Sequence, residues 1–160
     1  MKKILPFIIL LCSTSLMAQT VTVGSTTLTE RVVATGLVIP WEIIWGPDDF
    51  IWSTERTGVV RRINPNTGNM VTVLDLSSDI AGGASNEPGL LGMALHPDFL
   101  TTSKVYLVYN YFSGGSVKEK LVSYDWNGTS LMNETVLLGN ISGANIHNGS
   151  RLMFLPDGTL

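Results

Sequence analysis

Residues 42–68 read EIIWGPDDFIWSTERTGVVRRINPNTG, an apolar run that enters Pro-Asp and continues into two further β-rich runs. The same order recurs at residues 90–112, LLGMALHPDFLTTSKVYLVYNYF, and begins again at residues 150–160, SRLMFLPDGTL. Intervals of about 50 and about 60 residues separate the three Pro-Asp pairs, which is the spacing of a four-stranded propeller blade with its loops. The chain is therefore built on a repeat.

The physics of the repeat predicts an all-β fold. Proline fixes φ and aspartate favours a tight turn, so each Pro-Asp is expected to end the first strand of a blade and to return the chain as the second. No window from Val21 to Leu160 shows sustained helical periodicity. We predict a β-propeller of four-stranded blades, of which about the first two and a half are present, the third beginning at Arg151. Because a closed ring needs at least four blades, we expect the chain to be the N-terminal part of a longer protein.

The N-terminal residues predict export. Residues 1–18 place Lys2 and Lys3 before a short apolar core and end in small residues, as in a secretory signal peptide. The apolar part is shorter than a membrane span, so we expect none in the mature chain, which would be periplasmic or secreted. We assign residues 19–36 to a lead-in segment and residues 37–160 to the partial propeller. The single cysteine, Cys12, lies in the leader, so the mature chain has no disulfide.

The net charge of the chain limits the classes of partner that it is expected to bind. The formal net charge is -3, and no basic cluster occurs in the mature part. This argues against nucleic acid and anionic membranes as partners, and favours small soluble ligands.

The candidate site residues lie shortly before the second and third Pro-Asp pairs. Glu87 lies ten positions before Pro97, and His147 lies nine before Pro156. Pro40, Trp41 and Glu42 lie near the matching place in the first repeat. The first strand of each blade lines the central channel, and the loop before it lies at the channel mouth. We therefore expect Glu87 and His147 on adjacent blades, at the same height and facing one cavity.

Two interpretations of His147 fit this spacing equally well. Imidazole titrates near neutral pH and can take a proton from a hydroxyl, with a nearby carboxylate to orient a polyol. A loop histidine hydrogen-bonded to a neighbouring turn would give the same pattern. Gly143 and Gly149, which flank the histidine, are expected to let the backbone approach a flat ligand.

A family resemblance favours the first interpretation. PWEIIWGPDDFIWSTERTGVVRRINPNTG, EPGLLGMALHPDF, VYLVYNYF and IHNGSRLMFLPDGTL, in this order and spacing, resemble the start of the soluble sugar dehydrogenases that depend on pyrroloquinoline quinone (PQQ), the glucose/sorbosone dehydrogenase family. The resemblance extends from about Leu37 to the end of the chain. It implies a six-bladed propeller that holds PQQ and Ca²⁺ at the channel mouth and passes electrons from aldose sugars to an acceptor.

The resemblance also implies roles for individual residues. His147 matches the general base that removes the proton of the anomeric hydroxyl, while Glu87 and its neighbour in the site, Asn148, are assigned to cofactor binding. No metal ligand is assigned, because the calcium ligands, the aspartate that orients the base and the basic residues that hold the cofactor lie downstream in the family. The chain alone is therefore expected to be inactive.

Departures from the family pattern keep an alternative open. Ile146 stands where the glucose-oxidising branch has an acidic residue, and Ser150 stands where a second glycine is common. A broader range of aldoses is one consequence. The alternative function is a propeller without redox chemistry that binds carbohydrate or protein.

Other residues are assigned structural roles. His96 directly precedes the turn proline and is expected at the far end of the inner strand from the cavity. Strand alternation predicts that Arg61 and Arg62 pair across strands or face solvent. Trp41, Trp45 and Trp52 are predicted to wedge between blades.

Overall fold

The computed structural model describes residues 20–82 and 87–160, so the predicted leader lies outside the described residues. They fall into two units, which are described separately. In the first, β1 (Thr20–Val23) and β2 (Thr26–Thr29) pair as an antiparallel hairpin whose strand residues are all exposed. This hairpin occupies part of the expected lead-in segment.

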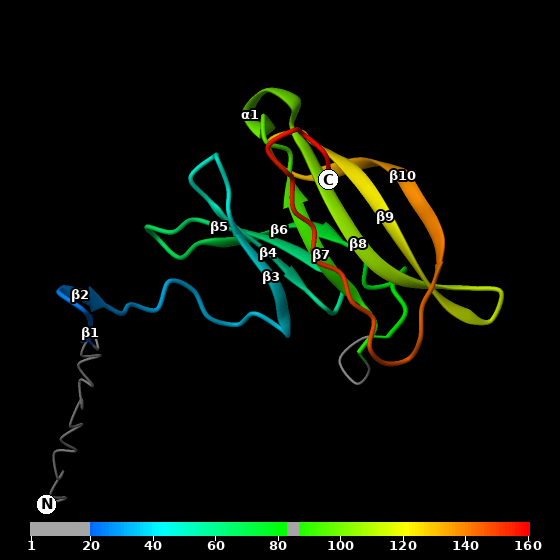
Figure 1. Cartoon of the computed structure of the whole chain (residues 1–160), viewed down its shortest axis with the longest axis horizontal. Helices are drawn as coiled ribbons and strands as arrows, with labels where there is room; N and C mark the ends of the chain where they lie inside the picture. The colour runs from blue at the N-terminus through cyan, green and yellow to red at the C-terminus, as the bar shows by residue number, and fades with distance from the viewer. Residues whose placement is uncertain (1–19, 83–86) are drawn as a thin grey trace, which may run out of the picture. The chain divides into compact units, whose positions relative to one another are not determined.

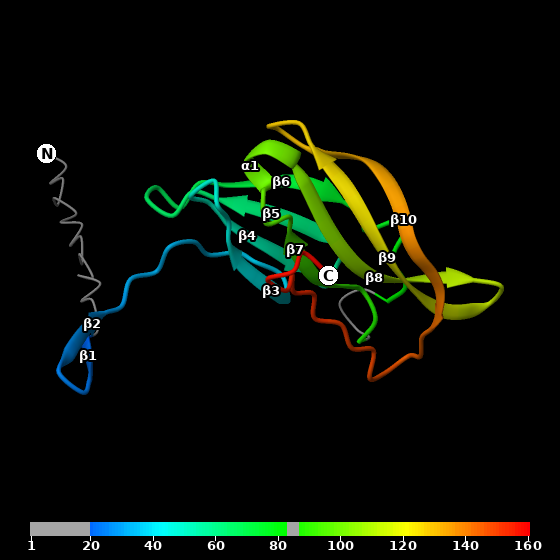
Figure 2. The same ribbon diagram turned by 45° about the horizontal axis from the view of Figure 1, so that its top comes forward.

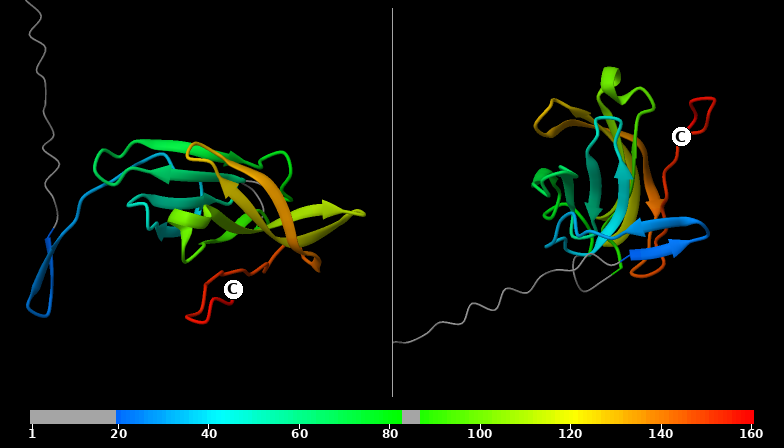
Figure 3. Two further views of the ribbon diagram at one scale, coloured as in Figure 1. Left: turned by 90° about the horizontal axis from the view of Figure 1, so that it is seen from above. Right: turned by 90° about the vertical axis from the view of Figure 1, so that its left-hand side faces the viewer.

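The second unit, residues 33–160, contains two four-stranded antiparallel sheets, each made of consecutive strands (Figures 1 and 2). The first contains β3 (Pro40–Trp45), β4 (Ile51–Glu55), β5 (Val59–Ile63) and β6 (Met70–Asp75). The second contains β7 (Leu90–Leu95), β8 (Lys104–Ser113), β9 (Ser116–Trp126) and β10 (Leu131–Ser142). The β8–β9 hairpin extends beyond the rest of its sheet (Figure 3, left). The predicted all-β architecture of four-stranded blades is confirmed.

The first two Pro-Asp turns differ in length. At Pro47, the chain reverses tightly, with the Gly46 N–H donating to the Phe50 carbonyl at 2.8 Å. After Pro97, a short helix, α1 (Phe99–Thr102), precedes β8. The prediction of a tight hairpin at this second Pro-Asp pair is therefore wrong, because α1 separates β7 from β8. None of the described residues form a helix long and apolar enough to cross a membrane.

The third Pro-Asp pair forms a turn without a strand in the described residues around it. The Leu155 N–H donates to the Thr159 carbonyl at 2.8 Å. Residues 150–155 run beside β7 (Figures 1 and 2), and the Gly92 N–H donates to Ser150 Oγ at 3.4 Å. The third repeat thus adds a segment to the inner side of the blades, but no hydrogen-bonded ladder.

Trp52 lies at the centre of the core between the two sheets. Its side chain is fully buried, and its ring makes edge-to-face contacts with Phe99 at 5.6 Å and Trp126 at 5.1 Å, both from the second blade. The predicted wedge between blades is confirmed for this residue. It is wrong for Trp41 and Trp45, which are 45% and 60% exposed, because these positions of β3 face away from the packed sheets.

Arg61 and Arg62 pair with acids of their own blade, as strand alternation predicts. Arg61 Nε lies 2.9 Å from Glu55 Oε1, and Arg62 Nε lies 2.9 Å from Asp48 Oδ2. Asp48 also accepts from Trp52 Nε1 at 3.1 Å, so its carboxylate links the first turn to the core.

Trp52 should dominate the stability of the two-blade unit. We expect Trp52→Ala to lower the free energy of unfolding by about 3–5 kcal/mol, because it leaves a cavity between the sheets. The control Leu100→Ala, at a position of α1 that is 69% exposed, should change it by less than about 0.5 kcal/mol. Chemical denaturation of the whole protein that contains this chain measures both. Equal effects of the two substitutions would contradict the wedge role.

Glu134 of β10 ties together the three outer strands of the second blade. Its carboxylate accepts hydrogen bonds from Tyr109 Oη at 2.8 Å and from Tyr124 Oη, and pairs with Lys120 Nζ at 2.7 Å. Burial alone would raise the pKa of the Glu134 carboxyl, but these three donors favour its ionised form and lower the pKa overall. Burial and the bonds to this carboxylate raise the pKa of both tyrosines.

This lowered pKa predicts a pH dependence. A carboxyl whose folded-state pKa lies below its unfolded value adds stability that is fully present above the unfolded pKa and is lost as the pH falls through the folded one. We expect Glu134→Gln to reduce the free energy of unfolding above about pH 5, the reduction shrinking in more acidic solution. Thermal unfolding of both proteins between neutral and acid pH measures the difference. A difference that stays constant with pH would contradict this assignment.

Candidate active site

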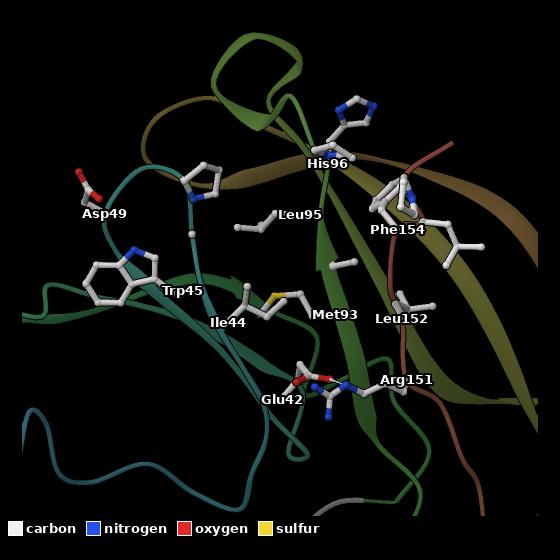
Figure 4. A pocket seen from close by; sticks show the side chains of 16 residues that line it. Glu42, Ile44, Trp45, Asp49, Met93, Leu95, His96, Arg151, Leu152 and Phe154 are labelled. Carbon is white, nitrogen blue, oxygen red and sulfur yellow. Dashed lines mark ion pairs between the residues drawn. The ribbon is translucent and has the colours of Figure 1, made fainter. Parts of the chain in front are cut away.

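The inner sides of the repeats line a common cavity of about 670 Å³ (Figure 4). Its walls come from β3, from β7 and from residues 151–156, and all three Pro-Asp prolines are among the lining residues. The wall is apolar over much of its length, while the pair Glu42 and Arg151 makes one end polar. The prediction that the first strand of each repeat faces a central channel agrees with this lining.

Glu87 and His147 contact one another outside the residues that line this cavity. The backbone N–H of His147 donates to Glu87 Oε2 at 2.6 Å, a contact between residues 60 positions apart in the chain. Both side chains are exposed, and neither is among the residues that line the cavity. The structure therefore brings the two predicted residues together, but the prediction that both face the cavity is wrong, because neither lines it. We refer to Glu87 and residues 144–149 as the rim.

The backbone at His147 has an unusual conformation. Its φ is 61°, in the left-handed region that residues with a Cβ adopt infrequently. The Glu87 carboxylate accepts a hydrogen bond from the backbone N–H of His147 and not from its imidazole. Among the described residues, the imidazole makes no hydrogen bond. Such a group, held by its backbone with its ring exposed, can accept a proton from a ligand.

Asn148 binds its own loop. Its Oδ1 accepts from the Ala144 N–H at 2.9 Å, and its Nδ2 donates to the Ala144 carbonyl at 2.6 Å. These two hydrogen bonds close a ring of residues 144–148, and His147 lies on that ring. Sequence spacing gave no indication of this local role.

Packing requires glycine at only one of the two positions that flank the histidine. A Cβ at Gly143 would lie 2.9 Å from Val117 Cγ1, so packing within the second blade excludes a side chain there. A Cβ at Gly149 would meet nothing within 4 Å. The expected role in approaching a ligand therefore does not explain Gly143, and only Gly149 leaves open space beside His147.

The pair Glu42 and Arg151 was not singled out by the sequence pattern. Arg151 Nε lies 3.1 Å from Glu42 Oε2, and their side chains point toward one another across the channel wall (Figure 4). Glu42 is 5% exposed, whereas the Arg151 side chain is 80% exposed. The available signal was the repeat position that the two residues share, because Glu42 and Arg151 each lie five residues before the proline of their Pro-Asp pair.

His96 has structural contacts, although it lines the cavity. Its Nδ1 accepts from the Asp98 N–H at 3.0 Å, and its ring lies 6.4 Å from that of Tyr106 and 5.5 Å from that of Phe154. The structural role expected for this residue agrees with these contacts. Its expected place away from the cavity is wrong, because the cavity extends along the whole inner strand to the Pro-Asp turns.

The sequence profile of the Glucose / Sorbosone dehydrogenase family matches residues 37–160. The chain belongs to this family. Quinoprotein glucose dehydrogenase B of Acinetobacter calcoaceticus is 31% identical over 137 residues, which make up 80% of this chain and 28% of that protein.

Solved structures of glucose/sorbosone dehydrogenase relatives share the fold. A glucose dehydrogenase-like oxidoreductase from Thermus thermophilus superposes with a TM-score of 0.70 at 31% identity, covering 80% of this chain and 37% of that one. The PQQ-bound aldose sugar dehydrogenase from Streptomyces coelicolor gives a TM-score of 0.65 at 30% identity, covering 80% and 38%. This chain therefore spans well under half the length of these relatives.

The contact between Glu87 and His147 should control the order of the rim loop. We expect Glu87→Ala to speed amide hydrogen exchange at His147 about fivefold to tenfold, because a hydrogen bond of about 1 kcal/mol no longer opposes local opening. Glu87→Gln keeps an acceptor oxygen and should have a smaller effect. Exchange of residues 144–149, followed by NMR or mass spectrometry, measures this. Unchanged exchange in Glu87→Ala would contradict the contact.

Proposed function

We propose that the whole protein containing this chain is an exported, PQQ-dependent dehydrogenase that oxidises aldose sugars at the anomeric carbon. The observation that carries this proposal is the contact between Glu87 and the backbone of His147, in a chain of the glucose/sorbosone dehydrogenase family. The A. calcoaceticus relative is a quinoprotein and the S. coelicolor structure holds PQQ, which supports the choice of cofactor. The apolar core of residues 4–11 behind Lys2 and Lys3 supports export to the periplasm or the exterior.

The rim residues fit one edge of a flat quinone cofactor. The open space at Gly149 leaves no side chain over the loop beside His147, and the Glu87 carboxylate fixes the loop through its backbone. We assign Glu87 and Asn148 to this edge, with Asn148 acting by shaping the loop. When bound, the quinone accepts the hydride that leaves the anomeric carbon.

His147 is the general base in this proposal. Its imidazole takes the proton of the anomeric hydroxyl, so that the C–O bond becomes a carbonyl as the C–H bond is lost as hydride. The exposed ring and its strained backbone, held by two neighbouring contacts, suit a group that must reach a bound sugar.

Calcium belongs to the proposal as a second cofactor. The described residues hold no group of three His, Cys, Asp or Glu that could bind a metal ion. We therefore assign its ligands to residues other than those described, and derive no step through it.

The test is activity of the whole protein reconstituted with PQQ and Ca²⁺, measured by dye reduction with several aldoses. We expect His147→Ala to lower kcat about 10²-fold to 10⁴-fold, the usual contribution of a general base. The matched control is Lys104→Ala, which breaks an exposed ion pair with Asp125 outside the cavity lining and should leave kcat nearly unchanged. A protein that binds carbohydrate but turns over no aldose would overturn the enzymatic proposal in favour of a binding module.

A further inference from the structure

We propose that Glu42 is a positioning residue for His147, acting through Arg151. The inference rests on the proposed function, because it concerns the same general base. It assigns a role to a buried carboxylate of the first blade for which spacing predicted only a place near the channel mouth, and to which the family resemblance gave no role.

Glu42 is itself fixed within the blades. Its backbone N–H donates to Thr54 Oγ1 at 3.1 Å, and that hydroxyl donates to the Leu91 carbonyl at 2.7 Å. Thr54 is fully buried, so this short chain of hydrogen bonds sets the spacing between β3, β4 and β7. The Glu42 carboxylate therefore has a defined place on the channel wall.

The segment that carries His147 is held at three points. Its first residue, His147, donates its N–H to the Glu87 carboxylate. Ser150 Oγ accepts from the Gly92 N–H, and Arg151 forms an ion pair with Glu42. The first two contacts both come from residues 87–92, at the start of the second blade. Among the contacts of the described residues, only the ion pair of Arg151 with Glu42 joins this segment to the first blade, so it fixes the direction in which the segment runs.

The unequal exposure of the pair argues for positioning rather than for stability. A carboxylate that is 5% exposed has lost much of its hydration. An arginine that is 80% exposed and the Ile43 N–H, which donates to Glu42 Oε1 at 3.3 Å, restore only part of it. Apolar residues at both positions would avoid that cost. The pair does give the segment a directional contact four residues from the base. Since misplacement of a reacting group by about 1 Å can cost about 10²-fold in rate, such a contact matters for kcat.

The experiment uses the whole protein reconstituted with PQQ and Ca²⁺. We expect Glu42→Gln to lower kcat about tenfold or more, with KM for the sugar changed less than about twofold, because the base is displaced while most sugar contacts remain. Amide exchange at residues 147–151 should become faster. The matched control Asp48→Asn breaks another largely buried Arg–carboxylate pair of the same blade and should lower the melting temperature without either effect.

A double variant separates positioning from folding. Arg151→Gln leaves the Glu42 carboxylate buried without its partner and should lower the melting temperature. Glu42→Gln/Arg151→Gln removes both charges and should recover most of that loss while kcat stays low. A kcat that recovers together with the melting temperature would overturn the positioning role.

The outcomes also distinguish this inference from the function on which it rests. If the unmodified protein turns over no aldose, the proposed function falls. If the unmodified protein is active and Glu42→Gln keeps the same kcat and the same exchange at residues 147–151, the function stands and the positioning role is overturned.

Discussion

A four-stranded antiparallel sheet has two faces, and the first blade buries one of them only by packing against the second. Trp52 fills that interface with edge-to-face contacts to two aromatic rings, and the Thr54 hydroxyl adds a buried hydrogen bond to the Leu91 carbonyl. Aromatic packing fixes how closely the sheets approach, while the hydrogen bond fixes their register. The inner strands β3 and β7 consequently form one continuous wall, and every contact at the rim depends on that wall.

The rim segment that carries His147 has no such ladder of its own. Its position depends on side chains that reach it from the blades, and on the ring that Asn148 closes with Ala144. Gly92 shows how close this approach is, because a Cβ there would lie 2.9 Å from the Ser150 carbonyl oxygen. A segment fixed by a few directional contacts can hold a backbone conformation, such as the positive φ of His147, that a regular strand would not allow.

Sequence periodicity could predict the blades because their strands and turns are encoded locally. The Pro-Asp pairs placed the inner strands, and counting back from them placed Glu87 and His147 near one another. It could not predict that the carboxylate would bind the backbone N–H rather than the imidazole, since that depends on the path of a loop. It did not find the pair of Glu42 and Arg151, which share a repeat position but are distant in sequence and meet because the third repeat runs beside β7. The exposure of Trp41 and Trp45 was missed for a similar reason: alternation gives the two faces of a strand but not which face is covered.

The charges at the rim also constrain how a cofactor can be held. Arg151 is the basic residue of this wall, and its guanidinium is already paired with Glu42. Glu87 adds a further negative charge next to His147. An anionic cofactor would meet repulsion from this edge unless cations elsewhere compensate it. Under the proposed function, this edge therefore serves proton transfer and orientation of the base, and residues other than those described supply the attraction for an anionic cofactor.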